Sequence, residues 1–166
     1  ARVSMSRRVI AVVGVMALAG VAWFLLHVGS RWNYQIVDYG VYQKYGDSMA
    51  HHRLVPYRDF QLEYPPGALP VFIAPSLLDS SNYDFWFQVL MFVCDEILVV
   101  AVAAIGGVRA AAIAAIAPLA LGSVVLSRYD LWPAVLAALA LCFVLQNRLR
   151  LSAVFLGTAA AAKLWP

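Results

Sequence analysis

Long, continuous runs of apolar residues dominate this chain and are separated by short polar segments. The runs are rich in Ala, Leu and Val, and they lie at about 9–28, 83–105, 110–126, 131–145 and 151–165. They lack the apolar–polar alternation of β-barrel strands. Lipid offers no partner for backbone N–H and C=O groups, so a run of this kind crosses a bilayer as a helix. The pattern predicts an all-α membrane protein, a multi-span helical bundle in which 1–166 form a single transmembrane domain.

The one long polar segment, about 29–82, is predicted to be an outer loop. Within it, helical spacing places five residues on one face: Asp38, Tyr42, Tyr45, Met49 and His52. This spacing predicts a short helix at the membrane surface, although Gly40 and Gly46 should weaken it. Residues 67–78 are apolar but too few to cross a bilayer, so we expect a second interfacial or re-entrant segment there.

Composition and charge agree with a membrane protein. The chain is 63% hydrophobic and 13% charged, with a formal charge of +3, whereas a soluble domain is about half apolar and a quarter charged. The basic residues stand at the ends of the apolar runs, which indicates orientation in a membrane rather than a nucleic-acid partner.

The short connections predict an inner (plasma) membrane protein whose N-terminus is cytoplasmic. In that orientation the cytoplasmic side holds basic residues without acidic neighbours: Arg2, Arg7, Arg8, Arg109, Arg148 and Arg150. A belt of aromatic residues then lies at the outer interface: Trp32, Tyr34, Trp86, Tyr129, Trp132 and Trp165. We read the first run as a retained signal anchor. Met5 could be the initiator methionine, and the sequence stops at Pro166, where the last predicted helix ends. We therefore expect a larger protein truncated at its C-terminus.

Motifs of soluble enzymes such as GxGxxG, the P-loop and HExxH are absent from the sequence. Candidate chemistry therefore lies near the outer face. Asp38 is either the N-cap of the surface helix or a carboxylate base at the membrane–water boundary. Arg58 and Asp59 form either a local ion pair in a rigid loop or the wall of a substrate site, because the planar fork of arginine suits phosphate and sugar.

Further charges lie beside or inside the apolar runs. Arg128 and Asp130 form either a solvated hairpin or part of a lipid-phosphate site, and Lys163 either snorkels to the interface or joins that site. Asp95 and Glu96 are expected near mid-bilayer, and their side chains point in different directions around the helix. At least one of them should therefore face the protein interior rather than lipid. They fit an ion or proton path, or a structural partner in helices beyond this chain.

Metal and disulfide signals are weak in this sequence. Asp47, His51 and His52 offer loose metal ligands on a solvated face, so we expect no metal and no cofactor. Cys94 and Cys142 both lie inside apolar runs, where a buried apolar role is expected.

Five motifs follow one another along the chain in a recognisable order. They are a signal-anchor helix, Asp38-Tyr39-x-x-Tyr42, Pro56-Tyr57-Arg58-Asp59-Phe60-x-x-Glu63-Tyr64-Pro65-Pro66, Arg128-Tyr129-Asp130, and Ala162-Lys163-Leu164-Trp165-Pro166. This order resembles the GT-C superfamily of membrane glycosyltransferases. The nearest branch is the bacterial family 87 type, which includes polyprenyl-phosphate-mannose-dependent mannosyltransferases.

The resemblance implies an enzyme, a polyprenyl-phosphate-sugar-dependent hexosyltransferase. It would move a sugar, mannose in this branch, from a lipid-linked donor to a glycan or glycolipid acceptor on the outer face of the membrane. It implies that Asp38 is the general base. The expected substrate-binding residues are Arg58, Asp59, Glu63, Tyr64, Arg128, Asp130 and Lys163. Two other classes stay open: a proton- or ion-coupled transporter that uses Asp95 and Glu96, and a non-enzymatic membrane scaffold.

Overall fold

The computed structural model describes residues 2–28 and 38–163, and every named secondary-structure element in that part is a helix. The α-helices are α1 (Arg2–Val28), α2 (Tyr39–Ala50), α3 (Leu69–Asp79), α4 (Tyr83–Leu121), α5 (Val124–Ser127), α6 (Leu131–Leu145) and α7 (Leu149–Ala162). Two 3-10 helices flank α3, namely η2 (Pro66–Ala68) and η3 (Ser80–Asn82). The prediction of an all-α chain is confirmed for these residues.

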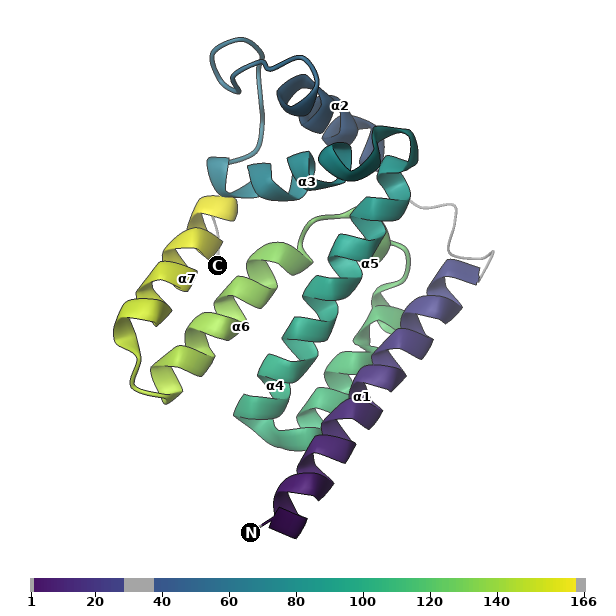
Figure 1. Cartoon of the computed structure of the whole chain (residues 1–166), viewed down its shortest axis with the longest axis vertical. Coiled ribbons are helices and arrows are strands. Elements are labelled where there is room, and N and C mark those ends of the chain that lie inside the picture. Colours follow the sequence, from purple (N-terminus) through teal and green to yellow (C-terminus); the bar gives the residue numbers. More distant parts are fainter. Residues whose placement is uncertain (1, 29–37, 164–166) are drawn as a thin grey trace.

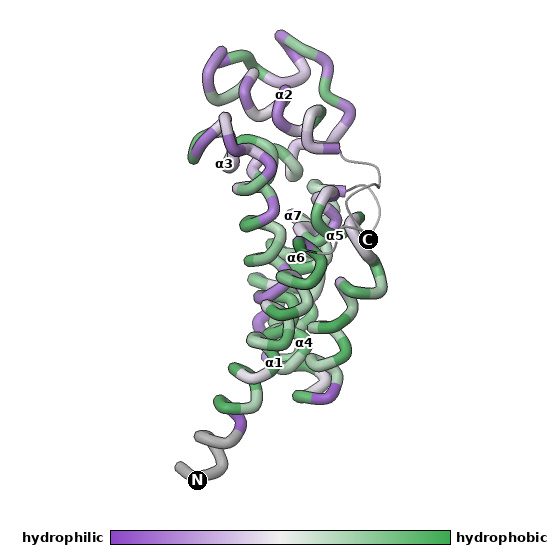
Figure 2. Tube along the Cα trace, turned by 90° about the vertical axis from the view of Figure 1, so that its right-hand side faces the viewer, coloured by the Kyte–Doolittle hydropathy of each residue, from purple (hydrophilic) through white to green (hydrophobic). Residues whose placement is uncertain are grey.

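The helices form two parts of different character. α1, α4, α6 and α7 lie side by side in a bundle, and α2 and α3 lie across one end of it (Figure 1). Colouring by hydropathy shows an apolar bundle and a mostly polar end at α2 (Figure 2). The short surface helix predicted around Tyr42 is thus present as α2, and the apolar segment predicted at 67–78 is η2 followed by α3.

Two helical segments are long and apolar enough to cross a membrane, Arg8–Val28 and Pro66–Leu121. Only 28% of the most apolar window of each segment is buried inside the protein. The core helix of a soluble protein would be mostly buried, so this exposure is consistent with membrane association. α6 and α7 are apolar but shorter, with 15 and 14 residues, so the five crossings stay a prediction.

A glycine divides α4 into two antiparallel arms. Gly107 has φ 78° and ψ −179°, a backbone conformation open essentially only to glycine, and here the chain reverses. The arms pack through small side chains, since Val99 joins Ala111 and Ala115 in a cluster with α1. The turn predicted at 106–109 is therefore confirmed. The next predicted run is interrupted, because Gly122 with φ 68° ends α4 before α5 begins.

Glycine also governs the packing of α2 on α3. Tyr42 and Gly46 are the buried residues of α2, and a Cβ on Gly46 would lie 2.3 Å from the carbonyl oxygen of Phe72. Gly46 was expected only to weaken the helix through its low propensity, and the structure adds a packing role, because its missing side chain lets α2 approach α3. His52 is exposed and follows the end of α2, so the predicted helical face ends at Met49.

The two ends of the bundle differ in charge, because one carries basic residues alone and the other carries both signs. The turn at Gly107 and the α6–α7 connection lie at the end opposite α2 (Figure 1), and they carry the exposed basic residues Arg109, Arg148 and Arg150. Apart from Asp95 and Glu96 in the middle of α4, the acidic residues all lie toward the other end. They are found just before and within α2, in the loop after it, at the end of α3, at the start of α4 and just before α6. Part of the predicted belt lies outside the described residues, namely Trp32, Tyr34 and Trp165.

Candidate functional site

Four charged residues that are distant in sequence converge where α2, α6 and α7 meet. Asp38 immediately precedes α2, Arg128 and Asp130 lie between α5 and α6, and Lys163 follows α7. Arg128 Nε lies 4.0 Å from Asp38 Oδ2 and 3.5 Å from Asp130 Oδ2. The ammonium of Lys163 hydrogen-bonds to Asp130 Oδ1. We call this group the four-charge cluster, and its two cations and two carboxylates sum to a formal charge of zero.

The carboxylate of Asp38 does not cap α2. Asp38 occupies the N-cap position, but its side chain makes no capping hydrogen bond. Its backbone carbonyl accepts hydrogen bonds from the N–H groups of Val41 and Tyr42, at 3.1 and 3.2 Å. The side chain instead accepts a long hydrogen bond of 3.4 Å from the Tyr42 hydroxyl and stays 25% exposed. The capping interpretation therefore does not account for the carboxylate.

Aromatic rings form the floor under the cluster. Tyr42 is fully buried, and its ring centroid lies 4.7 Å from that of Phe72, 5.6 Å from that of Tyr64 and 5.9 Å from that of Tyr129. Burial raises the pKa of Tyr42 well above its ordinary value, so its hydroxyl stays protonated and can donate to Asp38. This floor gives the carboxylate a fixed donor on one side.

Tyr129 links the floor to the cations. Burial, together with the nearby charge of Asp130, raises the pKa of Tyr129 to about 12. Lys163 Nζ lies 5.6 Å from the centroid of the Tyr129 ring, within the range of a cation–π contact. The Tyr129 hydroxyl donates to the carbonyl of Ala162 at 3.4 Å, beside Lys163.

Backbone contacts fix the helix ends that carry the cluster. A Cβ on Gly67 would lie 2.5 Å from backbone atoms of Ala161 and Ala162, so η2 packs directly on the end of α7. The indole N–H of Trp132 donates to the Gly67 carbonyl at 2.9 Å, which ties the start of α6 to η2. The position of the cluster therefore depends on how the polar end docks on the bundle.

The remaining predicted site residues lie in an exposed loop. Arg58 is 71% exposed, and its guanidinium pairs with the adjacent carboxylate of Asp59 at 2.8 and 2.9 Å. The Arg58 hydrogen bond, aided by the backbone N–H of Val55, lowers the pKa of Asp59. This geometry favours the local ion pair. Glu63 is exposed, and within the described residues neither it nor Arg58 has a hydrogen bond or ion pair with the four-charge cluster.

The two acids of α4 have different surroundings. Asp95 is 2% exposed, and its Oδ2 accepts a hydrogen bond of 2.8 Å from the indole N–H of Trp23 on α1. This confirms that at least one of the pair faces the protein interior. Glu96 Oε2 is buried and has no hydrogen-bond partner in the described part of the chain.

Metal binding finds little support in this geometry. Asp47 Oδ1 lies 3.8 Å from His51 Nε2, as their shared helix face predicts, and it also accepts a hydrogen bond from Ser80. Among residues 2–28 and 38–163, no group of three or more His, Cys, Asp or Glu side chains could hold a metal ion.

Several residues of the site escaped the sequence-based prediction. Tyr42 and Tyr129 were expected as parts of a helix face and an aromatic belt, yet both contact the charged residues. Gly67 and Trp132 hold the helix ends in place. The Pro65-Pro66 pair before Gly67 was the available signal, because it marks a rigid turn that must pack against something.

No protein-family model, curated protein or solved structure matches this chain. Its function must therefore be argued from its residues and their geometry.

Proposed function

We propose that this chain belongs to a membrane glycosyltransferase that moves a sugar from a polyprenyl-phosphate donor to an acceptor on the outer face of the membrane. The four-charge cluster carries this proposal. At the polar end of an apolar bundle, the carboxylate of Asp38 does not cap its helix and lies 4.0 Å from Arg128. Asp130 lies near Arg128 and binds the second cation, Lys163. A mannosyl group is the sugar that the family resemblance suggests.

The proposed membrane placement has three supports. Two segments are long and apolar enough to cross a bilayer, and the bundle exposes large apolar side chains such as Ile113 at 69%. The turns at the end opposite α2 carry Arg109, Arg148 and Arg150 and no acidic residue. Five crossings with the N-terminus in the cytoplasm would follow the positive-inside rule. A lipid-linked donor could then diffuse laterally to the cluster, with its phosphate at headgroup depth.

The proposed reaction is a direct displacement at the anomeric carbon. The acceptor oxygen forms a bond to that carbon, while the bond from carbon to the phosphate oxygen breaks and the phosphate leaves with the electron pair. Asp38 would take the proton of the acceptor hydroxyl. Arg128 and Lys163 would stabilise the negative charge that develops on the leaving phosphate. Inversion of the anomeric configuration follows from a single displacement.

Asp130 has a supporting role in this scheme. It binds Lys163 and lies near Arg128, so it holds both cations on the same side of the cluster. An arriving phosphate can share these cations because its oxygens accept the same hydrogen bonds as a carboxylate. Tyr64 and Tyr129 would lie beneath the sugar or its phosphate as parts of the aromatic floor.

An ion- or proton-coupled transporter is the second candidate, and the unpartnered oxygen of Glu96 favours it. The other acid, Asp95, already has a structural partner in Trp23. Substrate-driven proton uptake into vesicles that is lost in Glu96→Gln would support the transporter. Unchanged uptake in this variant would mean that the unpartnered oxygen of Glu96 no longer supports the transporter.

Substitution of the acids in the complete protein tests the transferase proposal. Asp38→Asn keeps the side-chain shape but removes the base, so transfer of sugar from a polyprenyl-phosphate donor should fall by about 10² or more. Asp59→Asn and Glu63→Gln are the comparison variants, because the same loop presents these carboxylates away from the cluster. Near-normal transfer by Asp38→Asn, or a larger loss in either comparison variant, would reject Asp38 as the base.

A further inference from the structure

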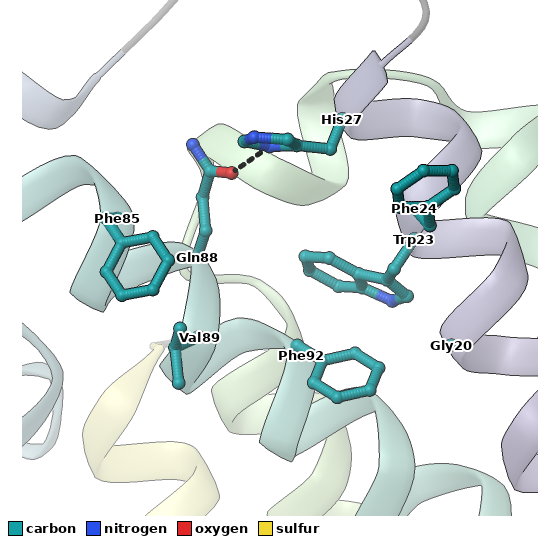
Figure 3. Close-up of a pocket in the computed structure, with 8 residues that line it drawn as sticks. All are labelled: Gly20, Trp23, Phe24, His27, Phe85, Gln88, Val89 and Phe92. Carbon is teal, nitrogen blue, oxygen red and sulfur yellow. Dashed lines mark hydrogen bonds between the residues drawn. The ribbon is translucent and has the colours of Figure 1, made fainter.

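A groove runs between α1 and α4, close to the polar end of the bundle. Its volume is about 260 Å³, and its lining residues are Gly20, Trp23, Phe24, His27, Phe85, Gln88, Val89 and Phe92. Four aromatic rings form most of its walls, and His27 and Gln88 close its upper end (Figure 3). Phe24 and Phe85 are 64% and 54% exposed, so the groove is open to the side.

A chain of hydrogen bonds fixes the polar end of this groove. The Tyr39 hydroxyl donates to the carbonyl of Leu126 at 2.9 Å, so its oxygen is the acceptor for Gln88 Nε2 at 3.0 Å. The amide oxygen of Gln88 then faces His27 Nδ1 at 3.1 Å, and the proton of a neutral His27 belongs on Nδ1. His27 Nε2 is left as a hydrogen-bond acceptor.

The electrostatics of this end favour a cation. Asp84 lies four residues before Gln88, on the same face of α4, and it is exposed. Burial, with a smaller contribution from the charge of Asp84, raises the pKa of Tyr39 to about 12. The lining residues of the groove, all within the described part of the chain, include no Arg or Lys. The groove thus has an acceptor nitrogen at its upper end, and the carboxylate of Asp84 directly precedes the lining residue Phe85 in the chain.

The α1–α4 face has a second hollow nearer the middle of the bundle. This hollow of about 220 Å³ lies further along the same two helices and is lined by Met16, Val93, Glu96, Ile97 and Val100. His27 and Met16 are 11 positions apart in α1 (27 − 16), or roughly 16 Å along the axis. This length is about half of the ~30 Å hydrocarbon core, which corresponds to one leaflet.

We propose that the α1–α4 groove is a binding site for one acyl chain of an aminophospholipid, with phosphatidylethanolamine as its ligand. The chain lies against the rings of Trp23 and Phe92, and the ammonium group donates to His27 Nε2 and pairs with Asp84. This site is separate from the four-charge cluster and does not depend on glycosyl transfer. A polyprenyl phosphate is a poor fit, because Asp84 repels its anionic head.

Photolabelling of the chain in phosphatidylcholine vesicles tests this proposal. The vesicles contain a small fraction of either phosphatidylethanolamine or phosphatidylglycerol with a diazirine in one acyl chain. Peptides that carry Phe24 and Phe92 should be labelled roughly two- to fivefold more by the ethanolamine lipid, the range expected from one exposed ion pair. The exposed Ile113 should be labelled equally by both lipids.

Three variants separate the groove from bulk lipid. Gly20→Leu places a side chain in the groove, where an added Cβ already reaches 3.9 Å from Phe92, and should abolish the preferential labelling. Gly14→Leu in the same helix meets nothing within 4 Å and should leave it unchanged. Asp84→Asn should remove the preference for ethanolamine over glycerol.

Each contrary outcome rejects the site. Equal labelling by the two lipids would show only bulk solvation of the helices. Equal effects of Gly20→Leu and Gly14→Leu would place the bound lipid elsewhere. Displacement of the ethanolamine lipid by unlabelled polyprenyl phosphate would identify the groove as a donor site instead.

Discussion

Adding one methyl group to either of two glycines in α2 should affect stability differently. Gly40 and Gly46 belong to the same helix, yet a Cβ on Gly40 meets nothing within 4 Å, whereas a Cβ on Gly46 would lie 2.3 Å from the Phe72 carbonyl oxygen and 2.4 Å from Ser76 Oγ. Close carbon–oxygen contacts occur at about 3.3 Å or more, so α2 and α3 must separate locally by about 1 Å. The Phe72 oxygen is a backbone atom and cannot rotate away.

The expected magnitudes follow from two opposing contributions. Replacing a helical glycine by alanine stabilises a helix by up to about 1 kcal/mol, and this gain applies equally to Gly40→Ala and Gly46→Ala. Overpacking costs about 1–3 kcal/mol and applies only to Gly46→Ala. The difference between the two variants therefore isolates the packing cost. At about 2–4 °C per kcal/mol for a chain of this size, their thermal midpoints should differ by roughly 2–12 °C.

Thermal unfolding of both variants in the same detergent, followed by tryptophan fluorescence, measures this difference. Gly40→Ala should melt at or above the temperature of the unsubstituted chain, and Gly46→Ala should melt below Gly40→Ala. If the two variants shift by the same amount, then α2 does not pack on α3 through Gly46, and the placement of Asp38 at the start of α2 loses its basis.

Three further predictions concern docking, the buried acid and topology. Gly67→Ala should cost about 1–3 kcal/mol by forcing η2 away from the end of α7, which thermal unfolding would detect; an unchanged midpoint would contradict the contact. Trp23→Phe leaves Asp95 without its hydrogen-bond donor and should lower the free energy of unfolding by about 1–3 kcal/mol. Asp95→Asn should cost less, because the asparagine oxygen can still accept the indole N–H, and the reverse order would contradict this hydrogen bond. An impermeant thiol reagent should label Ser48→Cys but not Asn147→Cys on intact cells, and the opposite pattern would invert the topology.

Local sequence patterns were enough to locate most helices of this chain. The apolar runs and the spacing around Tyr42 predicted helices that the structure contains, and the glycine pair at 106–107 predicted the reversal in α4. These signals are local, because they depend on residues within a few turns of one another. Gly122 shows the limit, since an isolated glycine inside an apolar run does not reveal that it will end the helix.

The candidate site was harder to predict because it is formed by tertiary contacts. Asp38, Arg128 and Lys163 could each be singled out as charges at membrane boundaries, but their proximity depends on the docking of η2 on α7. Arg58 had the same sequence-level signal, and the structure pairs it with its neighbour Asp59 instead. Nothing in the spacing of these residues distinguishes a charge that reaches the cluster from one that stays in its loop.

The cluster draws on residues from nearly the whole described length of the chain, and this has a consequence for biogenesis. Lys163 is made 125 residues after Asp38 (163 − 38), which takes roughly 6–25 s at the usual 5–20 residues per second of synthesis. Throughout that interval α2 can form, but Arg128 is absent for the first 90 residues (128 − 38) and Lys163 is absent until the end. The charges are brought together only after α7 has been inserted and η2 has docked on its end. A chain that stalls before α7 would contain Asp38 and the whole aromatic floor but would lack the completed cluster.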